Sequence, residues 1–272
     1  MKILFITRLS GRLANQLINL SLWFALGEAY NYAIVPCSFG WEMDFVGTRK
    51  HLFSRYVLLH SAAKVVRRVN IGYEQERDAT SLILDVLERG ESATINLEGW
   101  LPRALWRDVP AKKLRRYFMP TRRHLMSARR VCQTARGGQQ PLFGVHIRHT
   151  DFAHHDGGRW FLPLETVVRN MQYVRALRPD ARFLVCSDAR FNNNDFPGFD
   201  VAFGSGGVVS DLTALGLCDF ILKPAYSSFA LWSAWWGNTP CLAMQKEPKF
   251  QMGNFQVPEL DPFADSQNLA PD

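Results

Sequence analysis

The sequence lacks the features of a membrane-spanning, disulfide-bonded or zinc-binding protein. No apolar run reaches the roughly 20 residues needed to cross a bilayer, and residues 1–9 are not followed by the small-residue cleavage site of a signal peptide. The five cysteines are odd in number, widely spaced and without a CxxC pair, which is typical of reduced structural thiols. No D-x-D motif for a metal ion occurs. We therefore expect a cytoplasmic protein, and we predict no metal site.

Positive charge is concentrated in one part of the chain. The formal net charge is +7, but residues 101–136 hold eleven Lys and Arg against one acid, Asp108, so the remainder of the chain has an acidic excess. Such a segment is either a solvated helical face or a patch that holds the protein near anionic lipid headgroups, at the inner face of a membrane, or near a phosphorylated acceptor. No DNA- or RNA-binding motif accompanies it, so we expect no nucleic-acid partner.

Predicted strands and helices alternate along the chain. The patterning predicts strands over residues 2–9, 33–36, 93–97, 142–148, 182–186, 199–203 and 220–222, and helices over 17–30, 81–89, 163–177, 212–217 and 228–236, with one or two more in 110–136. This alternation indicates an α/β protein with parallel, doubly wound sheets. Composition changes at Gly137 and Gly138, so we expect two Rossmann-like domains, residues 1–137 and 138–272, that face a cleft. The polar tail after Lys246 shows little sign of a packed element.

The stretch FGVHIRHTD, residues 143–151, is the one around which we expect the chemistry to be organised. Its alternation predicts a central strand with one buried face and one face that carries polar groups. At the end of such a strand His146, Arg148, His149 and Asp151 could converge on a ligand, and the Arg148 guanidinium is the best anion receptor among them. The alternative, of equal weight, is that Arg148 and Asp151 form a local ion pair and the histidines are solvated.

Other predicted strands in the second half also end in polar residues. Ser187 and Asp188 follow one strand, Asp211 begins a helix, and Ser227 and Ser228 precede a Trp-rich helix. Helix capping is one explanation for these positions. The functional explanation is that the helix points its N–H groups at a phosphate held by Arg148, while Asp211 accepts hydrogen bonds from the N1–H and amino group of guanine. The second explanation predicts a site for a nucleoside diphosphate.

The first half begins with a strand, a glycine turn and a helix. The turn SGRLANQ, residues 10–16, would place backbone N–H groups and the Asn15 side chain at a helix N-terminus. That position suits an anion or a sugar hydroxyl. We therefore include Gly11 and Asn15 among the candidate binding residues.

Four segments resemble the motifs of one enzyme family. They are HIRHTD at 146–151, CSD at 186–188, DLTALGLCDFILKPAYSSFALWSAWWG at 211–237 and GRLANQ at 11–16. Together they are similar to the α1,2/α1,6-fucosyltransferase superfamily, closest to its bacterial α1,2 branch, glycosyltransferase family 11. The resemblance implies a GT-B fold, GDP-β-L-fucose as donor co-substrate, no cofactor and metal-independent, inverting transfer. The acceptor it implies is a hydroxyl of an oligosaccharide or lipid-linked glycan, with the 2-OH of a galactoside as the expected position, in bacterial glycan biosynthesis.

The resemblance also implies roles for individual residues. Arg148 would hold the β-phosphate, His146 and Asp211 would lie at the guanosine, Asp188 would support the donor site with its neighbour Ser187, and Ser227 and Ser228 would bind the diphosphate. His149 stands where the family has a second Arg. A protonated His149 would supply that charge, so we expect the rate to fall as the pH rises through neutrality. The departure leaves open a relative with another nucleotide-sugar donor, or an inactive nucleotide-sugar or glycan-binding protein.

The general base is expected in the loop after Arg148. Asp156, His154 and His155 lie there, and the resemblance favours Asp156, because related α1,6-type enzymes have an acid at about this spacing. The expected catalytic residues are therefore Arg148, Asp156 and His149. The alternative is a flexible loop that contains no base.

Overall fold

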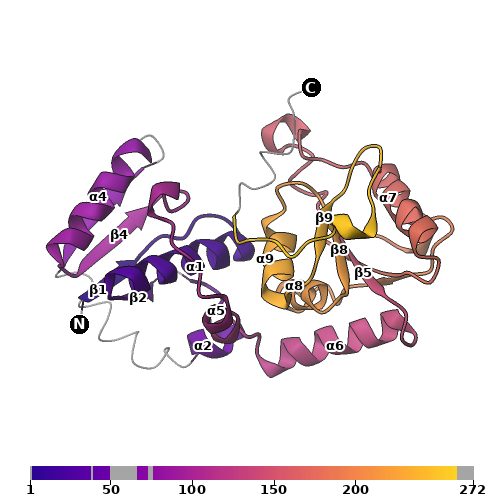
Figure 1. The fold of residues 1–272 in the computed structure, drawn as a ribbon, viewed down its shortest axis with the longest axis horizontal. Helices are drawn as coiled ribbons and strands as arrows, with labels where there is room; N and C mark the ends of the chain where they lie inside the picture. Colours follow the sequence, from indigo (N-terminus) through magenta and orange to yellow (C-terminus); the bar gives the residue numbers. More distant parts are fainter. Residues whose placement is uncertain (1, 38, 50–65, 73–75, 262–272) are drawn as a thin grey trace. The chain divides into compact units, whose positions relative to one another are not determined.

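The computed structural model describes residues 2–37, 39–49, 66–72 and 76–261, and these fold into two compact units that divide between Thr121 and Arg122 (Figure 1). The sequence placed the division at Gly137. The difference is helix α6 (Arg122–Arg136), which belongs to the second unit. It buries Ala128, Cys132 and Ala135 in a core that it shares with helix α8.

The first unit contains a four-stranded parallel sheet with the strand order β2-β1-β4-β3. The strands are β1 (Lys2–Ile6), β2 (Tyr32–Pro36), β3 (Arg67–Ile71) and β4 (Ala93–Leu97). The helices and 3-10 turns are α1 (Leu13–Tyr30), η1 (Glu42–Asp44), α2 (Val46–Arg49), α4 (Glu76–Arg89), η3 (Arg103–Leu105) and α5 (Ala111–Tyr117). Three of the strands were predicted. Strand β3 was not, because its RRVNI sequence contains only two apolar residues, Val69 and Ile71, and both are buried.

The second unit contains a five-stranded parallel sheet with the order β7-β6-β5-β8-β9. Its strands are β5 (Leu142–Ile147), β6 (Arg182–Ser187), β7 (Val201–Phe203), β8 (Phe220–Lys223) and β9 (Cys241–Ala243). Besides α6, its helices and turns are η4 (His155–Gly158), α7 (Leu164–Leu177), η5 (Asn193–Asp195), α8 (Val208–Gly216), α9 (Ser228–Gly237) and η6 (Met252–Asn254). The α/β, doubly wound character predicted from the sequence is confirmed.

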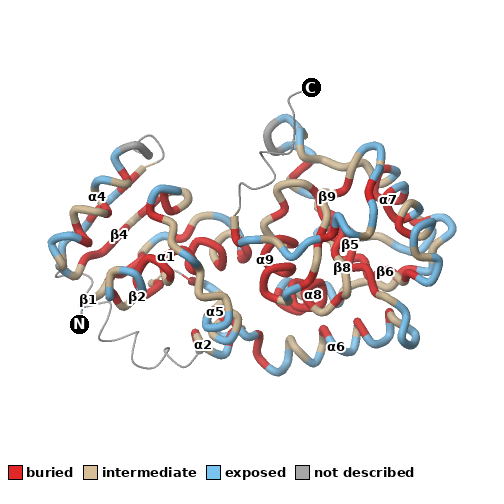
Figure 2. Tube along the Cα trace, viewed as in Figure 1, coloured by how far each residue is buried: buried red, intermediate tan, exposed pale blue. Residues whose placement is uncertain are grey.

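Helices cover both faces of this second sheet, so its central strand is buried throughout. Helix α7 packs on the face that carries Phe143 and Val145, whereas α6, α8 and α9 share a core with residues of the other face (Figures 1 and 2). All six residues of β5 are buried. The face predicted to carry polar groups, which includes His146, is therefore buried as well, as expected for a parallel sheet inside a doubly wound fold.

Glycines allow the closest contacts in this unit. A Cβ atom on Gly144 would lie 2.8 Å from Leu215 Cδ2, and one on Gly237 would lie 2.0 Å from the Gly216 carbonyl oxygen. Any side chain at these two positions would push helix α8 away from β5 or from α9. Gly144 thus lets α8 lie close to β5, and Gly237 lets the end of α9 lie against the backbone of α8.

The segment after Lys246 is packed as far as residue 261, which corrects the prediction of an unpacked tail. Phe250 and Phe255 are buried, and the Phe255 ring contacts the rings of Phe143 and Phe220. Residues Cys241 and Gln256 form an antiparallel bridge. Aromatic spacing without a periodic pattern gave no signal of this packing. Among the described helices, none is both long and apolar enough to cross a bilayer.

Candidate functional site

The strand order of the second unit defines where a ligand is expected. From the central strand β5 the chain first builds β6 and β7 on one side and then returns to build β8 and β9 on the other. In such sheets ligands bind beyond the carboxyl ends of the two strands at which the order reverses, here β5 and β8. Val145 pairs with Leu222, so the next residues along, His146 and Lys223, are neighbours at this switch point.

His146 is a buried and uncharged residue. It is 5% exposed, its Nδ1 lies 2.8 Å from Ser227 Oγ, and its ring stacks on Phe229 with centroids 5.0 Å apart. Burial, with help from the positive charges of Arg148 and Lys223, lowers the pKa of His146 to about 3, although Asp188 opposes the shift. At physiological pH the imidazole therefore contributes hydrogen bonds to the site and no charge.

Ser227 joins this histidine to the start of helix α9. It is the N-cap residue, is 1% exposed, and its Oγ accepts a hydrogen bond of 3.2 Å from the Ala230 N–H. The capping explanation is thus confirmed for Ser227. Capping leaves the N–H groups of Ser228 and Phe229, the first two of the helix, directed along its axis, where helix termini bind anions. Capping and phosphate binding are compatible here.

Arg148 lies one residue beyond β5 and forms the ion pair that was one of the two alternatives. Its Nε and Nη2 donate to the two carboxylate oxygens of Asp151 at 2.8 and 2.6 Å, and the guanidinium lies 4.3 Å from the centre of the Phe152 ring. The described hydrogen bonds of the guanidinium use two of its three nitrogens, and Nη1 is the third. Asp151 therefore orients Arg148 and leaves donors for an anion.

His149 and Asp188 shape the turn that follows β5. The His149 ring lies between Phe161 and Phe191, and its Nε2 lies 2.7 Å from the Leu162 carbonyl oxygen, which can only accept. Asp188 accepts hydrogen bonds from the His149 N–H at 2.8 Å and from the Thr150 hydroxyl at 2.5 Å. Next to it, Ser187 Oγ accepts from the Ala189 N–H at 3.0 Å. These residues anchor the turn, whereas the charge expected on His149 stays a prediction.

Asp211 binds the turn between β7 and α8. It is 7% exposed, and its oxygens accept from the Ser205 N–H at 2.7 Å, the Ser205 hydroxyl at 2.8 Å and the Gly206 N–H at 3.1 Å. Burial raises the pKa of this carboxyl, and the hydrogen bonds from the turn oppose the shift. A guanine base would have to share these oxygens with the three donors of the turn.

The remaining predicted site residues are Asp156, Gly11 and Asn15. Asp156 lies in η4, but its side chain is outside the described part of the structure. Gly11 and Asn15 belong to the first unit, where α1 begins at Leu13; Gly11 has φ +79°, and a Cβ atom there would lie 2.4 Å from Asn15 Nδ2. Only glycine therefore fits this turn, and the Asn15 amide lies against it.

Sequence reasoning missed one charged residue of the switch point. Lys223 is the last residue of β8 and is 4% exposed. The predicted strand ended at Leu222, so the lysine was assigned to the connection before Pro224. The signal that could have found it is positional, because a polar residue that ends a strand beside another polar strand end is expected at the ligand crevice.

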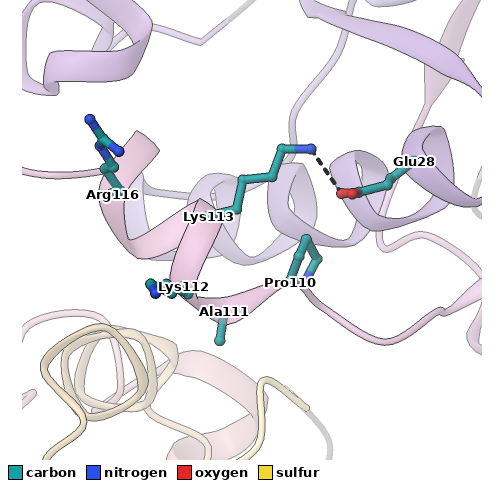
Figure 3. Close-up of a pocket in the computed structure, with 6 residues that line it drawn as sticks. All are labelled: Glu28, Pro110, Ala111, Lys112, Lys113 and Arg116. Carbon is teal, nitrogen blue, oxygen red and sulfur yellow. Dashed lines mark hydrogen bonds and ion pairs between the residues drawn. The ribbon is translucent and has the colours of Figure 1, made fainter.

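An open pocket of about 580 Å³ lies in the first unit, apart from all the predicted site residues (Figure 3). Its lining is part of the basic segment and the end of α1. The lining residues are Glu28, Pro110, Ala111, Lys112, Lys113 and Arg116. Lys113 Nζ donates to Glu28 Oε2 at 3.0 Å across it. Within the described part of the chain, no three His, Cys, Asp or Glu side chains are grouped so that they could hold a metal ion.

Comparisons with known proteins give a likeness of fold. No protein-family model matches the chain, and no curated protein matches its sequence. Among solved structures, POFUT1 in complex with GDP-fucose has a TM-score of 0.60 at 11% identity, covering 89% of this chain and 98% of that one. NodZ α-1,6-fucosyltransferase soaked with GDP-fucose has a TM-score of 0.58 at 15% sequence identity, and the match covers 94% of this chain and 97% of that one. The Arabidopsis thaliana FUT1 mutant R284K in complex with GDP has a TM-score of 0.57 at 13% sequence identity, and the match covers 91% of this chain and 71% of that one. The chain therefore has the GT-B fold that was expected.

Proposed function

We propose that the chain is a GDP-fucose-dependent glycosyltransferase. The observation that carries the proposal lies at the switch point of the second unit, where the uncharged His146 contacts Ser227, the N-cap of α9, and Arg148 follows His146 by two residues. Arginine and a helix N-terminus are the donors that phosphate prefers. The fold supports the choice of donor, since the similar structures were solved with GDP or GDP-fucose.

The reaction that we assign to the chain is a direct displacement. The bond between fucose C1 and the β-phosphate oxygen breaks with its electron pair going to GDP, and the acceptor oxygen bonds to C1 from the opposite face, which inverts the configuration. Negative charge therefore builds on the departing diphosphate. Arg148 and the first N–H groups of α9 stabilise that charge. Because these groups supply the positive charge, we propose that transfer needs no metal ion.

The acceptor proton is assigned to a carboxylate of the loop after Arg148. Asp156 is the candidate, because its backbone lies in η4, eight residues beyond Arg148. We propose the 2-OH of a galactoside in an oligosaccharide or lipid-linked glycan as the acceptor, and a closest relationship to the bacterial α1,2 branch. The support for both is the resemblance of residues 211–237 to the third motif of that branch.

Another nucleotide-sugar donor is the second candidate, and one observation favours it. Both oxygens of Asp211 are engaged by Ser205 and Gly206, so the carboxylate expected to select guanine is already used by the turn. A thermal-shift comparison with GDP, UDP, CDP and ADP, each with and without EDTA, separates the candidates. At about 100 times Kd, binding raises the melting temperature by on the order of 5–10 °C.

Stabilisation by GDP that exceeds that by the other nucleotides and survives EDTA is the expected result. Greater stabilisation by UDP, CDP or ADP would replace GDP-fucose with another donor. Binding of GDP without transfer from GDP-fucose to any galactoside or lipid-linked glycan would identify an inactive nucleotide-sugar-binding protein.

We further propose that helix α6 brings the enzyme to the cytoplasmic face of a membrane. Its exposed face carries Arg122, Arg123, Arg129 and Arg130, and the helix contains no acid. Anionic headgroups attract such a face by about 1 kcal/mol per cation near the surface. Sedimentation with phosphatidylserine vesicles should be lost in an Arg129→Ala/Arg130→Ala variant and kept in Arg148→Ala. Equal sedimentation of both variants would contradict the assignment.

A further inference from the structure

Helix α6 and the end of helix α8 bring two cysteines together in the second unit. The sulfur atoms of Cys132, on α6, and of Cys218, two residues beyond α8, lie 3.4 and 3.3 Å from the same acceptor, the Ala214 carbonyl oxygen. A hydrogen bond also joins the two thiols directly. A disulfide requires the sulfur atoms to approach to about 2 Å, and thiols already in contact can do so with the least movement of the backbone.

An ion pair holds the two helices together at this point. Arg136 lies one turn beyond Cys132 on α6, and Asp219 follows Cys218 directly. The Arg136 guanidinium donates from Nη1 and Nη2 to the two carboxylate oxygens of Asp219, at 2.5 and 3.2 Å. The two helices also pack against each other in one core through small side chains. The backbones that carry the two cysteines are therefore held close to each other without help from the thiols.

The two thiols differ in how readily they ionise. The hydrogen bond that Cys218 donates lowers the pKa of Cys132, and the charge of Arg136 lowers it further, against the effects of burial and of Asp219. The same hydrogen bond, together with burial, raises the pKa of Cys218 well above its ordinary value. The thiolate is the nucleophilic form of cysteine. Cys132 is therefore the thiol that attacks an oxidant, and Cys218 is the thiol that attacks the oxidised product.

Access to solvent distinguishes this pair from Cys186, a third cysteine of the same core. Cys186 is 1% exposed, its sulfur lies 3.9 Å from the Asp211 carbonyl oxygen, and burial raises the pKa of its thiol well above the ordinary value. Cys132 and Cys218 are 5% and 6% exposed, so neither is completely closed to solvent. Hydrogen peroxide is an uncharged oxidant little larger than water, and it suits a thiol with this limited access.

We propose that Cys132 and Cys218 are a modification site, at which peroxide oxidises the two thiols to a disulfide between α6 and the end of α8. In the first step the Cys132 thiolate attacks one peroxide oxygen, the O–O bond breaks, and hydroxide leaves with the proton that Cys132 had released, as water. Cys132 is then a sulfenic acid. In the second step the Cys218 sulfur attacks the Cys132 sulfur, and the displaced hydroxide takes up the Cys218 proton as a second water. The two thiols lose two electrons and the peroxide gains them. The proposal does not depend on the proposed function.

Peptide mapping of the wild-type chain tests the pairing. The reduced protein is treated with hydrogen peroxide, alkylated, and cut before aspartate, which places every cysteine of the sequence on a different peptide. Peptides 108–150 and 211–218 should be recovered joined to each other, and they should separate on reduction. Recovery of both peptides separate and alkylated would overturn the proposal, and so would a link from either of them to Cys186.

Single variants test the order of the two steps. Cys218→Ser removes the second thiol, so oxidation should stop at a sulfenic acid on Cys132, which dimedone traps. Cys186→Ser is the matched control, because it removes a buried thiol of the same core and should form the disulfide as wild type does. If dimedone labelled Cys218 in Cys132→Ser and did not label Cys132 in Cys218→Ser, Cys132 would not be the attacking thiol and the proposal would be wrong.

Oxidation should also stabilise the second unit. The bond closes a long loop that contains β5, β6, β7 and α8, and such closure lowers the entropy of the unfolded chain. We expect oxidised wild type to melt roughly 5–10 °C higher than reduced wild type. Cys132→Ser should melt at the same temperature before and after peroxide treatment. An equal shift in wild type and in Cys132→Ser would mean that another oxidised residue is responsible, and it would overturn the assignment.

Discussion

Both units contain a parallel sheet in which the strand order reverses, but the residues at the two points of reversal differ in burial. Each sheet has a switch point, between β1 and β4 in the first unit and between β5 and β8 in the second. At the first, Arg8 and Glu98 form an exposed ion pair, with side chains 53% and 31% exposed, and the Ser10 hydroxyl accepts from the Gly99 N–H. At the second, His146, Ser227 and Lys223 are all buried.

The difference indicates which edge is built for an anion. An exposed pair of opposite charges is close to neutral and contributes little to stability. Buried polar groups are costly and are expected where they bind a ligand. Topology thus provides two possible crevices, and we propose the one in the second unit because its strand ends carry the buried polar groups.

Removing Arg148, at the switch point of the second unit, should have the largest effect on activity. Arg148→Ala is expected to lower kcat/KM for transfer from GDP-fucose by about 100- to 1,000-fold, because a donor aimed at the departing charge is lost. Arg8→Ala, at the matching edge of the first unit, is the control and should change kcat/KM by less than about threefold. Steady-state kinetics with both variants measures this. Equal losses would remove the distinction between the two edges.

Acidification should destabilise the second unit through His146. Its pKa is about 3 in the folded protein and about 6.5 in the unfolded chain, so below pH 6.5 the unfolded chain binds a proton that the folded protein does not. Stability should therefore fall by about 2 kcal/mol between roughly pH 6.5 and pH 5, and the loss should continue towards pH 3. Urea unfolding over this range measures it. His146→Gln should flatten the profile, and an unchanged slope would show that His146 is not the responsible group.

Ser227→Ala and Ser10→Ala compare the loss of one serine hydroxyl at the switch point of each unit. Ser227→Ala removes the N-cap of α9 and the partner of His146, and should cost about 1–2 kcal/mol of stability together with affinity for GDP. Ser10→Ala removes one exposed-edge hydrogen bond to Gly99 and should cost about 1 kcal/mol or less, with GDP affinity unchanged. Chemical unfolding and titration of both variants with GDP give the comparison. If Ser10→Ala lost affinity for GDP and Ser227→Ala did not, GDP binding would be assigned to the first unit instead of the second.

The smallest effect on stability is expected from breaking the ion pair between Arg8 and Glu98, at the switch point of the first unit. Glu98→Gln breaks the contact with Arg8 and should change the free energy of unfolding by less than about 1 kcal/mol, since both side chains are solvated. A larger loss, measured in urea at low and high salt, would mean that this edge also holds a functional charge.

Periodicity predicted the order of most strands and helices because parallel sheets need apolar runs between turn residues. It did not predict β3, whose short RRVNI sequence contains only two apolar residues, Val69 and Ile71, or the packing of Phe250 and Phe255 after Lys246. The unit boundary moved from Gly137 to Arg122 because Ala128 and Cys132 contact α8, which spacing alone does not reveal.

The site residues were identified by type and position, but their partners were not. The sequence named His146, Arg148, Ser227 and Asp211 as polar strand or helix ends. It could not show that His146 is buried and neutral, because that depends on Phe229 and on helices covering both faces. It also could not show that Asp211 is engaged by Ser205 and Gly206, since a glycine turn has many conformations.

A crystal structure of the chain with GDP tests the central claim most directly. We predict that the diphosphate lies at the carboxyl ends of β5 and β8, with its oxygens accepting from Arg148 and from the N–H groups of Ser228 and Phe229. Diphosphate bound at the β1 and β4 edge, beside Arg8 and Gly11, would contradict the account.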